Sequence, residues 1–284
     1  MIIGGDKKPV IKNIQKNIQA KQFNAKVELN DPKLDLPTED QILEHFLQQR
    51  SQGTYHVKNI LARLGMRLIT QWCNRSTEVH GLHNLADLNT GAIITSNHFN
   101  PLDNTAIRYA LRSQHRRLYI VSQATNLQMQ GSLGFFMNYD DILPLGRGLN
   151  YLGKTFPQLL QTTLQQNNYI LIYPEQEMWF NYRKPRPLKR GPYYYAARFN
   201  VPVISCFVEM QDLKKPDNKQ FNQIRYLVHI LPIIYPQARL SDRDNSYYMM
   251  QQDYQQKKAA YEAAYQQKLT YNFETADIVG WRLS

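Results

Sequence analysis

Cysteine is scarce in this sequence, because only Cys73 and Cys206 occur among its 284 residues. Two cysteines exclude a disulfide-rich secreted scaffold, and neither has neighbours at metal-ligand spacing. Both lie in apolar stretches, so we expect them to be reduced, buried and unreactive, and we expect no metal site. A reducing cytosol is the compartment that fits this composition best.

Long apolar runs are also missing. No stretch of about 18 apolar residues occurs, which argues against a transmembrane helix. Residues 1–55 are polar and contain no apolar core of signal-peptide length. If the protein acts on lipid, we therefore expect it to lie on a membrane surface rather than to span it.

Acidic residues are outnumbered. The 23 Asp and Glu face 34 Lys and Arg, which gives a formal net charge of +11. This excess favours a polyanionic partner such as nucleic acid, an anionic membrane or a phosphate-bearing substrate. The basic residues form no recognisable nucleic-acid module, so we expect no nucleic-acid partner. A hydrophobic content of 43% is enough for a folded core.

The patterning divides the chain into two segments. We expect residues 1–76 to form an N-terminal arm with amphipathic helices, and residues 77–284 to form one domain that includes a C-terminal helix at 246–269. Within residues 58–72 apolar side chains recur at helical spacing and cations accompany them. Such a basic helix either rests on an anionic membrane or packs on the domain, and the pattern favours neither.

Short apolar runs alternate with helical stretches from residue 77 onward. This alternation predicts an α/β domain with a mixed, mostly parallel sheet flanked by helices, with the N-terminal helical arm and the C-terminal helix outside it. The helices that we expect between strands cover residues 102–113, 152–166 and 192–199. The expected strands cover residues 78–82, 92–96, 118–122, 142–145, 169–173, 203–209 and 226–231.

The most specific local feature follows the expected strand at 92–96. His98 and Asp103 are separated by four residues, on a turn for which Asn100 supplies a helix N-cap and Pro101 the first helical position. Asp103 is then expected at the third helical position, where the helix dipole favours a carboxylate. A carboxylate beside an imidazole fixes its tautomer, and such a pair can deprotonate a hydroxyl. Alternatively, Asp103 only caps the helix and His98 only ends the strand.

Four segments in order resemble the motifs of the lysophospholipid acyltransferase family, the PlsC-like 1-acylglycerol-3-phosphate acyltransferases. The first has the pattern Asn-His-x4-Asp, the second is an apolar strand that ends on an arginine, the third delivers Pro-Glu into a loop, and the fourth begins with Val-Pro. The resemblance covers about residues 77–232, and the motifs lie at residues 97–103, 141–147, 169–175 and 201–204.

The resemblance implies an enzyme, an acyltransferase that moves a fatty acyl group from an acyl thioester to a hydroxyl of a lysophospholipid such as 1-acylglycerol-3-phosphate. His98 would be the general base and Asp103 would orient it. Acyl-CoA or acyl carrier protein would be the donor, with no permanently bound cofactor. We expect Arg147 to hold the acceptor and Glu175 to bind it or to organise its loop.

The cellular setting follows from the same resemblance. The enzyme would serve phospholipid biosynthesis in a bacterial cytoplasm, associated peripherally with the inner face of the cell membrane. Its expected partners are an anionic membrane surface, the lipid acceptor and acyl carrier protein. A non-catalytic membrane-surface binding protein is a less favoured alternative.

The third motif departs from the family. It usually continues Glu-Gly-Thr-Arg, whereas this chain has Glu175-Gln176-Glu177-Met178, so the arginine is missing and a second carboxylate is present. Either the cation-rich run at residues 183–190 contacts the acceptor phosphate, or the acceptor is a non-phosphorylated glycolipid or cell-envelope compound. The run can also be a solvated loop that faces a membrane. The expected substrate-binding residues are Asn97, Arg147, Glu175, Glu177, Arg183, Lys184, Lys189 and Arg190.

Three further expectations concern the surroundings of the site. The active site should lie where the strand that ends at Ser96 meets the strand that ends at Tyr173, under the cation-rich run, and a hydrophobic tunnel for the acyl chain should start there. Trp179 and Phe180 either dip into a membrane interface or pack under the loop as a lid. Ser205 replaces the second proline that usually ends the fourth motif.

Overall fold

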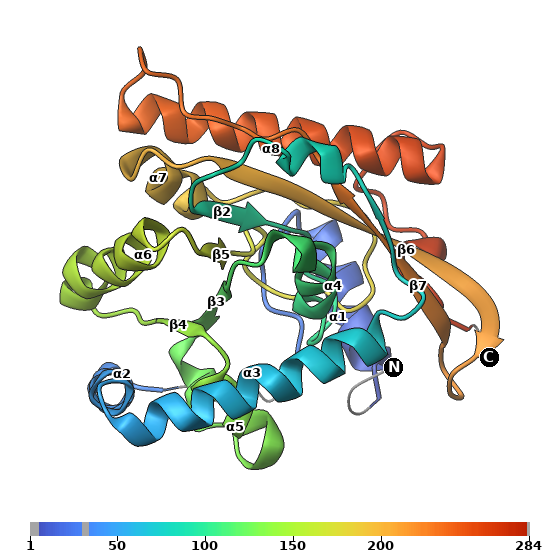
Figure 1. The fold of residues 1–284 in the computed structure, drawn as a ribbon. Coiled ribbons are helices and arrows are strands. Elements are labelled where there is room, and N and C mark those ends of the chain that lie inside the picture. The colour runs from blue at the N-terminus through green and yellow to red at the C-terminus, as the bar shows by residue number, and fades with distance from the viewer. Residues whose placement is uncertain (1–5, 30–33, 283–284) are drawn as a thin grey trace.

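Seven strands form one sheet in the computed structural model, which describes residues 6–29 and 34–282 (Figure 1). The strand order is β1-β7-β6-β2-β5-β3-β4. Among the seven strands of the described residues, only the β6–β7 pair is antiparallel, and every other neighbouring pair is parallel. The mixed, mostly parallel α/β fold and its seven strands are therefore confirmed. The strands are β1 Glu78–His80, β2 Ala92–Thr95, β3 Leu118–Gln123, β4 Ile142–Leu145, β5 Tyr169–Leu171, β6 Val203–Pro216 and β7 Asn222–Ile230.

Helices cover both faces of the sheet. Helix α4 (Asn104–Ala110) packs on one face, where Ile94 joins its apolar cluster. The opposite face, which carries Ile93, packs against α6 (Phe156–Gln165), α7 (Gly191–Arg198) and α8 (Asp242–Tyr265). Because both faces are buried at the centre of the sheet, the central strands β2 and β5 are continuous apolar runs rather than alternating ones.

The described residues of the N-terminal arm form three helices, α1 (Lys8–Gln19), α2 (Leu36–Arg50) and α3 (Gly53–Cys73). Helix α1 packs its apolar face into one cluster with Trp179 and Phe180. Both aromatic side chains are completely buried, so they pack under the loop after β5 and do not reach a membrane interface. In the described residues no helix is both long and apolar enough to cross a bilayer.

Two helices differ from the expected pattern. Helix α5 (Gly131–Tyr139) was not expected, because two glycines lower the helical propensity of its short segment. Gly134 is required there, since a Cβ atom would lie 1.8 Å from the Met129 carbonyl oxygen. The expected helix at 152–166 is present, but its first turn is π-helical (Tyr151–Thr155) and runs directly into α6.

A buried polar cluster attaches α8 to the sheet. Asp253 accepts hydrogen bonds from Thr95 (2.7 Å) and from the Tyr193 hydroxyl. The Lys257 ammonium is ion-paired to Asp253 and donates to Thr95 (2.8 Å) and Ser205 (3.3 Å). Ser205 therefore supplies an acceptor for Lys257 at the position where the family usually has a proline. Both charged side chains are fully buried, so each depends on the other for compensation.

Replacing Lys257 by Met should lower the free energy of unfolding by about 3–5 kcal/mol, because the Asp253 carboxylate stays buried without its cation. Urea denaturation would measure the loss. The double variant Asp253→Leu/Lys257→Met should recover more than half of it, since no isolated charge remains. A single variant within about 0.5 kcal/mol of the parent protein would contradict this role.

Candidate active site

The candidate site lies at the carboxyl edge of the parallel strands. Strands β2 and β5 are parallel neighbours, so the segments that follow them emerge side by side. His98 follows β2 and Tyr173 follows β5, and their rings stack with centroids 3.9 Å apart. The structure thus brings the ends of these two strands together as the sequence predicts.

The Asp103 carboxylate is the centre of the site and is only 2% exposed. Its Oδ2 accepts from His98 Nδ1 (2.8 Å), from the Phe99 amide (2.9 Å) and from the Asn100 amide (3.2 Å). Its Oδ1 accepts from the Tyr173 hydroxyl at 2.6 Å. Four donors therefore compensate a buried charge and fix the orientation of the imidazole.

These contacts correct the expected position of Asp103 in its helix. Helix α4 begins at Asn104, so Asp103 precedes it and does not occupy the third helical position. The reason is that the carboxylate turns back to bind the amides of residues 99 and 100. Asp103 therefore closes the turn that carries His98, and the four residues between them form that turn.

Tyr173 is a site residue that the sequence analysis missed. Burial, and then the neighbouring Asp103 carboxylate, raise the pKa of Tyr173 well above its ordinary value, so it stays a hydrogen-bond donor. His98 Nδ1 lies 2.8 Å from an acceptor-only carboxylate, so Nδ1 is the donor, and in the neutral ring Nε2 is the nitrogen that can accept a proton. The His98 side chain is 21% exposed. In the sequence, the only signal that could have identified Tyr173 is its position after a strand that lies next to β2.

Glu175 organises the loop that follows β5. Its carboxylate accepts from the amides of His98 (3.3 Å) and Arg186 (2.9 Å). The Arg186 guanidinium pairs with the same carboxylate at 2.8 Å, and both side chains are buried. Of the two roles expected for Glu175, the geometry favours loop organisation. Arg186 provides the cationic partner of Glu175 in a chain whose third motif lacks its own arginine.

The N-terminal arm closes over this loop. The Asn24 side-chain amide donates to the carbonyls of Glu175 (3.1 Å) and Pro187 (2.8 Å). Arg186 donates to the Phe23 carbonyl at 2.9 Å, and its guanidinium lies 4.6 Å from the Trp179 ring centroid. The arm and the site loop are therefore joined through shared hydrogen bonds.

The cation-rich run does not form one solvated loop. Arg183 and Lys184 both pair with the buried Asp277, and Lys184 is 1% exposed. With Arg186 also paired internally, only Lys189 and Arg190 of this run are exposed. The expectation that this run contacts a phosphate or faces a membrane fails for Arg183 and Lys184, because both pair with one buried carboxylate, that of Asp277.

The remaining expected substrate-binding residues lie in different surroundings. Asn97 is buried and pairs through its side-chain amide with both backbone groups of Val208, which positions the turn. Arg147 follows β4, donates to Glu39 of α2 (2.8 Å), and keeps a side chain that is 61% exposed. Glu177 is partly exposed and accepts from Gln123 at 3.4 Å.

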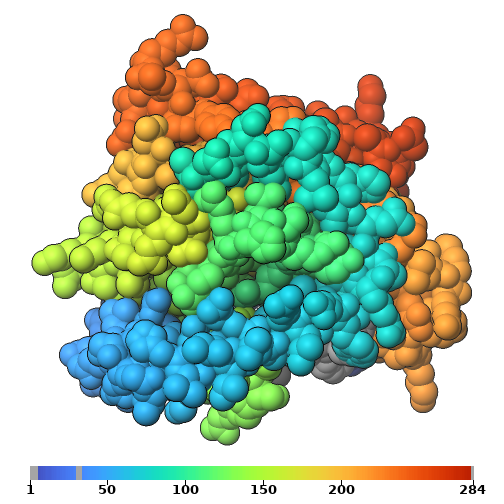
Figure 2. All heavy atoms as spheres, in the orientation of Figure 1, coloured from blue at the N-terminus to red at the C-terminus, as the bar shows by residue number. Residues whose placement is uncertain are grey.

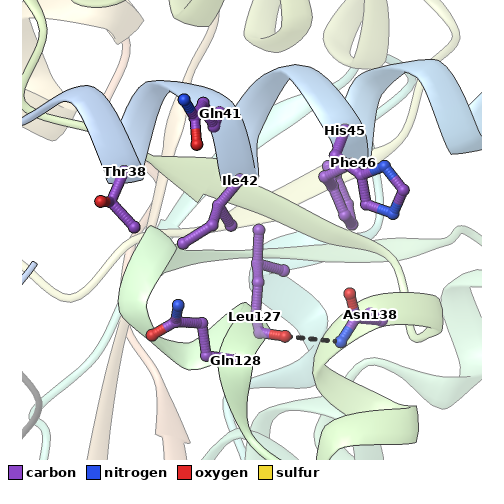
Figure 3. A pocket seen from close by; sticks show the side chains of 8 residues that line it. All are labelled: Thr38, Gln41, Ile42, His45, Phe46, Leu127, Gln128 and Asn138. Carbon is purple, nitrogen blue, oxygen red and sulfur yellow. Dashed lines mark hydrogen bonds between the residues drawn. The ribbon is translucent and has the colours of Figure 1, made fainter.

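Two cavities stand out in the described part of the chain, and neither is lined by His98 or Asp103. The smaller, about 290 Å³, lies between α2 and the segment around Leu127, with Asn138 donating to the Leu127 carbonyl (Figure 3). The expected acyl tunnel at His98 stays a prediction.

Replacing Arg186 by Gln should lower the free energy of unfolding by about 3–5 kcal/mol, because it leaves Glu175 buried without a cation. It should also speed protease cleavage around residues 23–25, since the arm loses a contact. Arg190→Gln removes the same charge from an exposed position and should change stability by less than about 0.5 kcal/mol. Equal losses in the free energy of unfolding for the two substitutions would contradict the assignment of Arg186 as the buried partner of Glu175.

The family model described as Acyltransferase matches residues 76–209. No curated protein sequence matches the chain. The fold is similar to the crystal structure of the 1-acyl-sn-glycerophosphate (LPA) acyltransferase PlsC from Thermotoga maritima, with a TM-score of 0.52 and 12% identity over 92% of this chain and 99% of that chain. Residues 76–209 are therefore similar to the acyltransferase family, and the chain has a fold similar to that of PlsC.

Proposed function

We propose that this protein transfers a fatty acyl group from an acyl thioester to a hydroxyl of a lysophospholipid such as 1-acylglycerol-3-phosphate. The observation that carries the proposal is the His98–Asp103 pair, held by four donors to one carboxylate at the edge of the sheet. The acyltransferase-family match over residues 76–209 supports it independently.

The reaction needs only one proton acceptor. His98 Nε2 takes the proton of the acceptor hydroxyl while its oxygen attacks the thioester carbonyl, and Asp103 stabilises the imidazolium. The carbon–oxygen bond forms, the carbon–sulfur bond breaks, and the proton passes from His98 to the departing thiolate. Acyl-CoA and acyl carrier protein both present the required thioester.

Three exposed cations are available to an acceptor phosphate. Lys189 and Arg190 follow the site loop, and the Lys189 amide donates to the Pro174 carbonyl at 2.8 Å. Arg147 lies at the same sheet edge, pairs with Glu39 and keeps a side chain that is 61% exposed. An arginine binds phosphate in a planar bidentate arrangement, so this set favours a phosphate-bearing acceptor.

A second acceptor class is favoured by one observation. Arg183, Lys184 and Arg186 all serve internal carboxylates, while Glu177 stays partly exposed beside the site loop. A carboxylate accepts hydrogen bonds from sugar hydroxyls and repels a phosphate. The alternative function is therefore O-acylation of a non-phosphorylated glycolipid or cell-envelope acceptor by the same His98 chemistry.

Both functions place the enzyme at a membrane, because acceptor and product are lipids. We propose peripheral association with the cytoplasmic face of the cell membrane, where acyl-CoA and acyl carrier protein are available. The net charge of +11 favours a surface rich in anionic lipid.

Purified protein should acylate lysophosphatidic acid with acyl-CoA or acyl carrier protein as donor. His98→Ala should lower kcat/KM by about 10²–10⁴-fold, because the general base is lost. Thioester turnover measured beside a non-phosphorylated glycolipid separates the two acceptor classes.

Acylation of the glycolipid alone would favour the alternative function. Turnover by His98→Ala equal to that of the parent protein, with any acceptor, would contradict the proposed mechanism.

A further inference from the structure

The two parts of the N-terminal arm have different surroundings. The blue atoms of α2 and α3 lie along the lower part of the face shown in Figure 2. Helix α1 and the segment that follows it pack instead with Trp179 and Phe180 of the loop after β5. Residues 6–29 therefore contact the loop that carries Glu175, although they lie outside residues 76–209, which match the acyltransferase family.

The loop after β5 has a narrow neck. Its two ends meet where the Lys189 amide donates to the Pro174 carbonyl at 2.8 Å. The carbonyls of Glu175 and Pro187 come close enough there to share one donor group, the side-chain amide of Asn24, at 3.1 and 2.8 Å. An –NH₂ group carries two hydrogens, so Asn24 can donate to both carbonyls at once. Asn24 therefore bridges the two ends of the loop from outside it.

Two groups with roles in the proposed reaction lie at this neck. On one side, the Glu175 carboxylate accepts from the His98 amide at 3.3 Å. On the other side, Lys189 and Arg190 follow Pro187 and are exposed. The geometry of the neck therefore sets the separation between the base and these two cations.

The C-terminal segment holds the middle of the same loop. Lys184 Nζ donates to the Asn272 carbonyl at 2.8 Å, and the Tyr271 hydroxyl donates to the Pro185 carbonyl at 3.0 Å. Lys184 also pairs with a buried carboxylate at 2.8 Å. Removing the Asn24 amide therefore releases the neck while the middle of the loop keeps its contacts.

We propose that Asn24 is a positioning residue for acyl transfer, which keeps the neck closed and so places the cations of the acceptor site at a fixed separation from His98. The inference rests on the proposed function, and it makes the N-terminal arm part of the acceptor site. In 1-acylglycerol-3-phosphate the reacting hydroxyl and the phosphate are on neighbouring carbons, so the acceptor reaches base and cations together only over a narrow range of separations. An acyl thioester carries no phosphate beside its reacting carbon and does not depend on this separation.

Steady-state kinetics of Asn24→Ala test the inference. The KM for lysophosphatidic acid should rise by about 10-fold, since one to two hydrogen bonds are lost at the neck, and the KM for the acyl thioester should change by less than about twofold. Asn24→Asp keeps the shape of the side chain, but a carboxylate cannot donate, so this variant should raise the acceptor KM at least as much.

The matched control is Asn13→Ala. Asn13 is also a half-buried asparagine of the arm, and its side-chain amide donates to the Val27 carbonyl at 2.9 Å, which does not belong to the loop. Both KM values of this variant should stay within about twofold of those of the parent protein, because the neck keeps its bridge.

Hydrogen–deuterium exchange gives a second readout that needs no turnover. Peptides that contain Lys189, whose amide closes the neck, should exchange about 10-fold faster in Asn24→Ala and at the parental rate in Asn13→Ala. Parental exchange at Lys189 in Asn24→Ala, or an equal rise of both KM values, would overturn the inference alone. A parent protein that acylates no acceptor would overturn the proposed function, and this inference with it.

Discussion

The buried carboxylate of Asp103 holds together the features on which the proposed chemistry depends. It closes the turn after β2 by accepting two backbone amides, it orients His98, and it accepts the Tyr173 hydroxyl from the neighbouring strand. A charge that is 2% exposed needs such compensation, because an unpaired buried carboxylate is strongly unfavourable. The parallel pairing of β2 and β5 makes the arrangement possible, since it delivers both segments to one edge.

A second buried ion pair, between Glu175 and Arg186, links the site to the N-terminal arm. Glu175 binds the His98 amide on one side and Arg186 on the other, and Arg186 in turn donates to the Phe23 carbonyl. Asn24 completes the connection through the carbonyls of Glu175 and Pro187. The arm is therefore part of the site's support, and the arginine that the third motif lacks has a counterpart eleven residues after Glu175.

The sequence predicts the sheet well because its central strands are short apolar runs between turn residues, and it predicts His98 and Asp103 because their spacing is local. Tyr173 is missed because its partner Asp103 follows another strand, and only the strand order brings the two together. Arg186 is missed because its partner Glu175 lies eleven residues earlier in the same irregular loop, where no local spacing marks the pair. The expectation that the run at 183–190 contacts a phosphate or faces a membrane fails for a related reason. Cations that are adjacent in sequence are separated by Asp277, which lies 93 residues beyond Lys184 and takes two of them out of solvent.

The central claim is that Asp103 makes His98 a competent base. The most direct measurement is single-turnover acyl transfer by Asp103→Asn, which keeps the shape of the side chain but removes its charge. The account predicts a rate lower by about 10²–10⁴-fold in a protein that remains folded. Tyr173→Phe, which keeps the ring stacked on His98 and removes one donor, should fall between this variant and the parent protein. A folded Asp103→Asn protein with the parental rate would contradict the account.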